Sequence, residues 1–307
     1  MPRLTPPPAT HSPPTAPGAA VAPAAVGRAC GCGVGRRAFT SLLLAGAAAP
    51  VLAAVPECKR SWTTKAIPAA KVEGSAQKQY AQLVGQARAQ GALAPDSNVQ
   101  LQRLRYIAAR MVPQTPACNE RARQWKWEIN LLDNSQVNAF CMPGGKIAFY
   151  SGILSTLKLN DDEVAMIMGH EVAHALLEHA RERMAKSGGT ELLLRGGAAL
   201  LGLGGLGDLA AHGATGLLSM TFSRSDESQA DALGLVLAAN AGYDPRAGVT
   251  LWQKMGAATG GKAPPPWLST HPAGASRIKD IQARLPRVLP AFEKSARPPR
   301  RFEAAKS

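Results

Sequence analysis

The chain has 307 residues, 46% of them hydrophobic, and a formal net charge of +14 at pH 7. This length would allow two domains, but the first fifty or so residues are mostly proline, alanine and glycine without apolar periodicity, which is not typical of a folded domain. The positive charge can attract acidic lipid head groups or acidic unfolded chains, whereas the lack of a basic stripe interleaved with aromatic residues argues against nucleic-acid binding.

Residues 1–54 are predicted to be a disordered leader that ends in an export signal. Arg36 and Arg37 precede an apolar stretch over 42–54, an arrangement that resembles a twin-arginine signal peptide. The stretch is shorter than the roughly 20 residues that span a bilayer. Cleavage before Ala54 is therefore the favoured interpretation, with an uncleaved hydrophobic helix as the alternative. We expect an exported, periplasmic protein, with association with the outer membrane as a further expectation.

Three cysteines remain after the leader, namely Cys58, Cys118 and Cys141. In an oxidising compartment, the simplest count is one disulfide and one free thiol. We expect the disulfide to join Cys118 to Cys141. Lipidation of Cys58 is an alternative, although Pro56 and Glu57 before it do not match a lipobox.

The first half of the remaining chain predicts two helices followed by a small sheet. The periodicity of apolar residues predicts, in chain order, a helix over 75–92, a helix from a cap at Asp96 or Ser97 to Met111, a strand over 125–131, and two shorter strands over 137–141 and 146–150. A Pro-Gly-Gly turn at 143–145 joins the two shorter strands. The predicted sheet is antiparallel.

The second half is predicted to be helical. The expected helices cover 151–157, 162–184 with a cap at Asn160 or Asp161, 226–241, 245–258 and 273–285. The Leu-, Ala- and Gly-rich segment 188–219 is predicted to be a flap over the functional site, with a buried helix pair or a membrane-dipping hairpin as alternatives. The folded domain is expected over 75–285, after a linker at 55–74 and before a basic, proline-containing, disordered tail at 286–307. A membrane-surface role of this tail is a further alternative.

One sequence motif in the predicted helix over 162–184 indicates a chemical function. His170-Glu171-Val172-Ala173-His174 is an HExxH sequence, and residues four apart lie on one face of a helix. His170 and His174 can therefore present ring nitrogens to one metal ion, with Glu171 beside them. This is the signature of a zinc-dependent hydrolase in which the glutamate acts on a water molecule.

A catalytic zinc site needs a third protein ligand. A zinc site whose third ligand is a histidine six residues after His174 is excluded, because position 180 is Ala180. Glu227 is the favoured carboxylate ligand, since Asp231 lies one helical turn later and can accept a hydrogen bond from a ligand histidine. Asp226 is the local competitor.

Four segments together resemble the HtpX, BepA and LoiP group of gluzincin metallopeptidases, relatives of the CAAX prenyl endopeptidases. They are NAF-x-x-PGG-x-I at 138–147, HEVAHALLEHARER at 170–183, ESQAD at 227–231 and THPAGASRI at 270–278. The resemblance covers roughly 75–285 and is greatest to the compact secreted branch. It implies a zincin-like α+β fold, mainly helical with a small antiparallel sheet before the HExxH helix.

The resemblance also implies the roles of individual residues and one Zn²⁺ per chain. His170, His174 and Glu227 are the implied zinc ligands, Glu171 the general base, and Asp231 a partner behind the ligands. Because zincins usually add an extended peptide to an edge strand, the expected substrate-binding residues are Asn138, Ala139, Phe140 and Gly145.

Two residues of the last segment complete the candidate site. His271 is expected to stabilise the oxyanion opposite Glu171 or to occupy the open zinc position in a resting enzyme. Arg277 is expected to orient His271 or to pair with Asp231 or Asp280.

The predicted function is a zinc endopeptidase that acts on misfolded or mislocalised envelope proteins in protein quality control. The expected partners are unfolded or misfolded proteins, with no nucleic acid and with membrane-surface association as an open expectation. A chaperone-like peptide-binding module with structural zinc is the alternative function, and a membrane-tethered interaction protein is a third.

Overall fold

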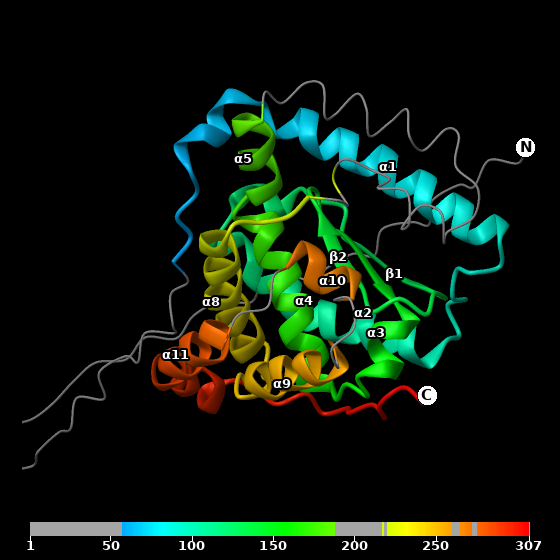
Figure 1. Ribbon diagram of the computed structural model, residues 1–307, viewed down its shortest axis with the longest axis vertical. Coiled ribbons are helices and arrows are strands. Elements are labelled where there is room, and N and C mark those ends of the chain that lie inside the picture. The colour runs from blue at the N-terminus through cyan, green and yellow to red at the C-terminus, as the bar shows by residue number, and fades with distance from the viewer. Residues whose placement is uncertain (1–56, 188–216, 218–219, 260–264, 272–274, 307) are drawn as a thin grey trace, which may run out of the picture. The chain divides into compact units, whose positions relative to one another are not determined.

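The computed structural model describes residues 57–187, 217, 220–259, 265–271 and 275–306 (Figure 1). The predicted leader at 1–54 lies outside the described residues, as does the predicted flap at 188–219 except for residue 217. Within the described part, none of the helices is long and apolar enough to cross a membrane.

Helices and short strands alternate along the described chain. The first group is η1 (Trp62–Ala66), α1 (Ala69–Ala89), α2 (Val99–Met111), η2 (Val112–Ala117), η3 (Glu120–Arg123), β1 (Glu128–Leu132), β2 (Ala139–Met142) and β3 (Lys146–Tyr150). The second group is α3 (Ser151–Thr156), α4 (Asp161–Leu176), α5 (His179–Lys186), α8 (Arg224–Asn240), α9 (Ala247–Thr259), α10 (Pro266–Thr270) and α11 (Ala275–Lys294). The predicted α+β fold, mainly helical with a small sheet before the HExxH helix, is confirmed.

The sheet is mixed rather than purely antiparallel. Its strand order is β1-β3-β2, with β2 antiparallel to β3 and β1 parallel to β3. The predicted hairpin of β2 and β3 is thus correct. After β1, however, the chain first forms β2 at the opposite edge of the sheet, and β3 then pairs between β1 and β2. This insertion makes β3 the central strand, with all five residues buried, and leaves β2 at an edge.

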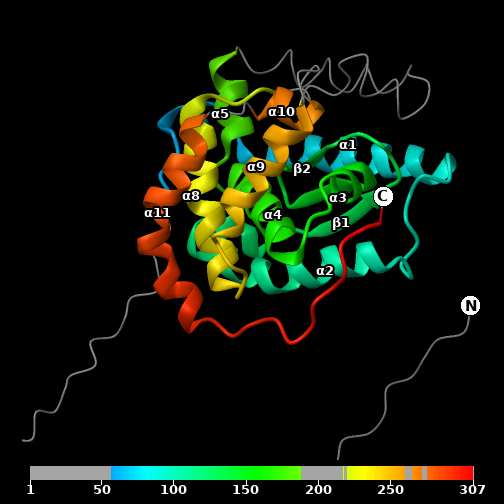
Figure 2. The same ribbon diagram turned by 60° about the horizontal axis from the view of Figure 1, so that its bottom comes forward.

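Two hydrophobic layers enclose the sheet. Alternate side chains of β3 point to opposite faces, so Ile147 and Phe149 join the core formed with α2 and α4, while Ala148 and Tyr150 join the core formed with α1. Beyond α4 lie α8 and then α11, whereas α1 runs across the opposite side of the sheet (Figures 1 and 2). The HExxH helix α4 is therefore central and is covered on both sides.

Helices α4 and α8 touch backbone to backbone. A Cβ atom on Gly169 would lie 2.7 Å from the carbonyl oxygen of Gly234, and one on Gly234 would lie 2.8 Å from the amide nitrogen of His170. No side chain fits at either position without a shift. This close crossing places the start of α8 beside the two histidines of α4.

The predicted helix over 162–184 is two helices. A capping box between Asn160 and Glu163 begins α4, so Asn160 rather than Asp161 is the cap, and α4 ends at Leu176. Glu178 then adopts a left-handed conformation with φ of 60°, which turns the chain before α5 begins at His179. Nothing in the apolar spacing marks this break, because the residues on both sides of it are good helix formers.

The start of the domain also differs from expectation. The range 55–74, predicted as a linker, contains η1 and the first turns of α1, and Val72 is buried against α5. The cap of α2 is Asn98 rather than Asp96 or Ser97. Its side-chain oxygen accepts hydrogen bonds from the backbone amides of Gln100 and Leu101.

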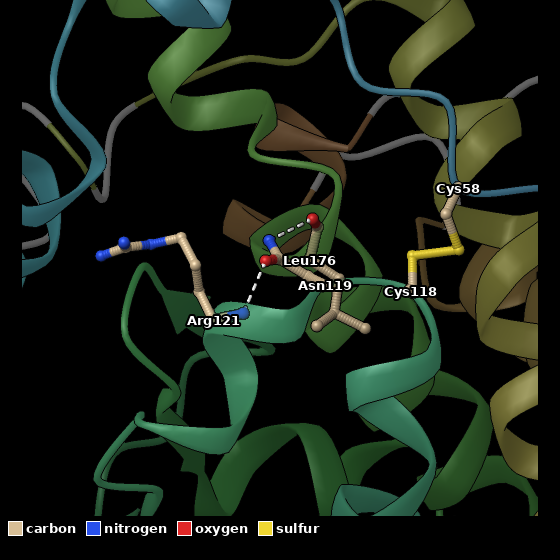
Figure 3. The surroundings of a disulfide bond; sticks show 5 residues. All are labelled: Cys58, Cys118, Asn119, Arg121 and Leu176. Atoms are coloured by element: carbon tan, nitrogen blue, oxygen red, sulfur yellow. Dashed lines mark hydrogen bonds between the residues drawn. A yellow bond between two sulfur atoms is a disulfide. The ribbon is translucent and has the colours of Figure 1, made fainter.

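The disulfide joins Cys58 to Cys118, with 5.3 Å between the Cα atoms, so the predicted pairing of Cys118 with Cys141 is wrong (Figure 3). Cys141 is free and lies on β2. Next to the bridge, Asn119 donates a hydrogen bond to the carbonyl of Leu176 at the end of α4 (Figure 3). The disulfide thus holds the N-terminal segment against the loop that supports the HExxH helix.

The C-terminal segment is folded onto the domain. Helix α11 continues to Lys294 rather than ending near Leu285, although it contains Pro286 and Pro290, because the buried side chains of its last turns pack on the core. The segment after it was expected to be disordered. Instead, the amide of Phe302 donates to Asp161 and Arg301 pairs with Asp162 at 2.9 Å.

Candidate metal centre and substrate cleft

Four buried side chains bring potential metal ligands together. His170 and His174 come from α4, Glu227 from the first turn of α8, and His271 from the end of α10. One nitrogen or oxygen atom from each lies within 4.8 Å of those of the other three. The sequence-predicted ligands therefore converge, and His271 converges with them.

The facing atoms fit a zinc ion. Nε2 of His170 lies 3.0 Å from Nε2 of His174 and 3.2 Å from Nδ1 of His271, and Glu227 lies 3.4 to 3.5 Å from the two α4 histidines. Imidazole lone pairs have no reason to face one another in a buried site unless a cation or a proton lies between them. Two imidazoles and a carboxylate are a donor set that zinc takes in catalytic sites.

The pKa values of the cluster are shifted in different directions. Burial opposes a charge on His170, but hydrogen bonds with Asp231 and Glu227 outweigh burial and raise the pKa of His170 to about 9. Burial lowers the pKa of His174 well below its ordinary value despite the nearby Glu227. Burial also acts against ionisation of Glu227, yet the surrounding histidines lower its pKa far below the ordinary value. These shifts favour an ionised Glu227 beside a protonated His170.

Arg277 and Asp231 lie behind the ligands. Asp231 Oδ1 is 3.0 Å from Nδ1 of His170. A carboxylate is a usual partner of the outer nitrogen of a ligand histidine. Arg277 donates to both oxygens of Asp231 at 2.6 and 2.8 Å and to Oε2 of Glu227 at 2.6 Å. Of the expected partners of Arg277, the structure shows Asp231, and it adds Glu227. The guanidinium also lies 3.8 Å above the ring of Trp252, which fixes its plane.

Glu171 points into the site from the same helix as the histidines. Its Oε1 accepts a hydrogen bond of 2.7 Å from Nε1 of Trp267 and lies 3.5 Å from Nε2 of His271. Among the described residues, no donor is bonded to its Oε2. The carboxylate is thus held in one orientation with one oxygen available to a water molecule.

A cleft runs along the edge strand β2 past Glu171 and His174. Asn138, Ala139 and Phe140, three of the predicted substrate-binding residues, line it. Gly145 does not, because it lies at the β2–β3 turn, where a Cβ atom would lie 2.7 Å from the ring of Trp127. Further lining residues come from α1, α4, α5, α10, the rest of β2 and the segments before β1 and α8, and include Val72, Glu73, Glu178, Ala180, Met220 and Phe222.

Three residues at the centre were not predicted from the sequence to act there. Trp267 bonds Glu171, Phe222 stacks on His174 with 4.1 Å between ring centroids, and His179 contacts His174. Neither Trp267 nor Phe222 lies in one of the four segments that resemble the known group. His179 lies within the HExxH segment at 170–183, where no ligand spacing singles it out.

Residues 99–285 match peptidase family M48. The mitochondrial metalloendopeptidase OMA1 of Arabidopsis thaliana is 40% identical over 153 residues, which are 50% of this chain and 30% of that protein. The OMA1 protein of Schizosaccharomyces pombe is 38% identical over 163 residues, 52% of this chain and 47% of that protein. The beta-barrel assembly-enhancing protease of Escherichia coli is 28% identical over 177 residues, 54% of this chain and 36% of that protein. The matched region thus spans less than half the length of each of these relatives.

These similarities confirm the gluzincin relationship at the level of the family and correct two narrower expectations. The predicted grouping is matched only in part, because the proteins named OMA1 are more similar in sequence than the beta-barrel assembly-enhancing protease. The expected periplasmic location, with or without the outer membrane, is contradicted, since the relatives of higher identity carry names that place them in mitochondria.

Proposed function

The chain belongs to peptidase family M48, and we propose that it is a zinc metalloendopeptidase that cleaves extended segments of unfolded or misfolded proteins. The observation that carries this proposal is a buried carboxylate, Glu171, beside a cluster of four ligand atoms and at the wall of a cleft that follows an edge strand. A structural zinc site has no use for a base at this place.

His170, His174 and Glu227 would hold the zinc ion. When bound, zinc supplies Lewis-acid chemistry that polarises the scissile carbonyl and favours loss of a proton from water. Asp231 holds His170 through the outer nitrogen Nδ1, and Arg277 holds Glu227 through Oε2. Four of these five side chains come from α4 and α8, the two helices that cross at Gly169 and Gly234.

Glu171 acts as the general base. Its Oε2 accepts the proton of the attacking water, while the hydrogen bond from Trp267 holds Oε1. The same carboxyl group then delivers the proton to the nitrogen of the leaving amine. His271 lies with Nδ1 among the ligand atoms and Nε2 toward Glu171. From there it can fill the fourth ligand position in a resting state, or donate to the oxyanion after its ring has moved.

The substrate lies along β2. Peptide pairing with an edge strand supplies main-chain hydrogen bonds that do not depend on sequence, which suits a protease of unfolded chains. Apolar groups of Val72, Met220 and Phe222 that also line the cleft favour segments with hydrophobic side chains. Such segments are exposed when a protein is misfolded.

The test is casein cleavage by the purified protein with and without a zinc chelator. Glu171→Gln is expected to retain one zinc ion per chain and to lose about 10²- to 10⁴-fold in turnover, the range that general-base catalysis contributes. Glu120→Gln, at an exposed glutamate, is the matched control and should cleave as the wild type does. Normal turnover by Glu171→Gln would contradict the assignment, and suppression of casein aggregation without cleavage by the wild type would favour a chaperone-like module.

A further inference from the structure

His179 is a buried histidine that the mechanism above does not use. Its side chain is 2% exposed, and its Nδ1 lies 2.9 Å from Nδ1 of His174. Its other nitrogen, Nε2, has no hydrogen-bond partner among the described residues. A leucine would fill this space without leaving a buried polar atom unpaired, so packing alone does not explain a histidine at this position.

The backbone is shaped to bring His179 to His174. On a continuous α-helix, residues five apart are about 140° apart around the axis and do not meet. The left-handed Glu178, with φ of 60°, breaks the helix and directs the first residue of α5 back to the last turns of α4. A left-handed conformation is unfavourable for a residue with a side chain. Arg181 braces the turn by bonding both Glu178 and the carbonyl of Ile67.

The direction of the hydrogen bond follows from the geometry of His174. Its Nε2 faces His170 and Glu227 at 3.0 and 3.4 Å, so a zinc ion held by these residues would take the lone pair of Nε2. A neutral imidazole then carries its proton on Nδ1, and that proton points to Nδ1 of His179. His179 is thereby the acceptor, with its own proton on Nε2.

The two α4 ligands are therefore held by different partners. Nδ1 of His170 faces the carboxylate of Asp231, whereas Nδ1 of His174 faces a neutral ring. Both arrangements fix the ring orientation and leave Nε2 free for the metal, since the outer partner of a ligand histidine sets its tautomer. Only the first adds a negative charge, and Arg277 balances that charge.

We propose that His179 is a positioning residue that accepts a hydrogen bond from Nδ1 of His174 and so holds Nε2 of His174 unprotonated and turned toward zinc. The inference rests on the proposed zinc site. It assigns to α5 a part in metal binding, although α5 contributes no ligand.

Three variants of the full chain separate this role from packing. His179→Asn places an amide oxygen near the position of Nδ1 and keeps an acceptor, while His179→Leu has similar bulk and no acceptor. Met184→Ala removes a fully buried side chain from α5 without touching His174. It therefore reports on general loosening of the helix.

Zinc affinity, measured by competition with a chromophoric chelator, is the first readout. His179→Leu is expected to bind zinc about 10- to 100-fold more weakly, the loss usual for an outer partner of a ligand histidine, while His179→Asn stays within about threefold of the wild type. Met184→Ala should lower the melting temperature and leave the affinity unchanged. Equal affinity of His179→Leu and the wild type, or an equal loss in Met184→Ala, would overturn the inference.

The tautomer of His174 is the second readout, and it needs neither zinc nor activity. Long-range ¹H–¹⁵N correlation spectra of the zinc-free protein are expected to show the Nδ1–H form of His174 in the wild type and in His179→Asn, and a mixture of forms in His179→Leu. An unchanged tautomer in His179→Leu would refute the role. If the wild type itself fails to bind zinc, the proposed function fails instead, so the two failures are distinguishable.

Discussion

Substitution of Gly234 by alanine is expected to disturb the metal centre from a distance, without removing any ligand. The added Cβ would lie 2.8 Å from the amide nitrogen of His170 and 2.9 Å from the carbonyl carbon of Gly169. Ordinary contact begins near 3.4 Å, so α8 must move away from α4 by roughly 0.6 Å. Both contact atoms are backbone and cannot swing aside.

The magnitude follows from two opposing effects. Replacing glycine by alanine within a helix gains about 1 kcal/mol, and overpacking of a tight contact costs about 1–3 kcal/mol. Gly85→Ala in α1 is the matched control, because no described atom lies within 4 Å of the place that its Cβ would take, and it should only gain. Gly234→Ala should therefore unfold at a temperature about 2–12 °C below that of Gly85→Ala, at about 2–4 °C per kcal/mol for a domain of this size.

Zinc binding is expected to weaken as well. Glu227 lies two turns from Gly234 on the same rigid helix, so a shift of α8 carries its carboxylate away from His170 and His174. Loss of ligand positioning typically costs at least tenfold in metal affinity. Differential scanning calorimetry and chelator competition on the two glycine variants measure both effects. Equal melting temperatures and equal affinities in the two would refute the reasoning that the crossing sets the site.

Three more outcomes follow from the structure. Arg277→Met should lower the free energy of unfolding of the zinc-free protein by about 3–5 kcal/mol, because two buried carboxylates, Glu227 and Asp231, lose their counter-ion. Urea titration measures this free energy, and a loss of less than about 1 kcal/mol would contradict the prediction. Cys58→Ser should lower the free energy of unfolding by up to about 4 kcal/mol, since the bridge to Cys118 closes a 60-residue loop. Thermal unfolding of this variant and of the wild type under non-reducing conditions checks this, and an unchanged melting temperature would argue against the pairing. Burial acts to raise the pKa of Asp231, but hydrogen bonding to His170 and the charge of Arg277 outweigh burial and lower this pKa. The contribution of Asp231 to stability is therefore present above its ordinary pKa of 3.8 and is lost as the pH falls below that value. Acid unfolding of the zinc-free wild type should therefore be steeper than that of Asp231→Asn, and parallel curves would count against it.

The sequence alone determined the local chemistry of this protein. The HExxH word lies on one helix, so the spacing of His170, Glu171 and His174 fixes their common face whatever the rest of the chain does. The capping box at Asn160 and the hairpin that ends in β3 are equally local. The choice of Glu227 with Asp231 also came from helical spacing, combined with the resemblance of the surrounding segments to a known group.

The tertiary structure decided everything that depends on how distant segments meet. Trp267 and His179 reach the centre because α10 and α5 bring them to the side chains of α4, and no periodicity encodes which buried side chain will face which ligand. The disulfide pairing and the parallel contact of β1 with β3 depend in the same way on the path of the chain. Hydrophobic spacing predicts which face of an element is buried, but the partner of that face is chosen by the packing of the whole domain.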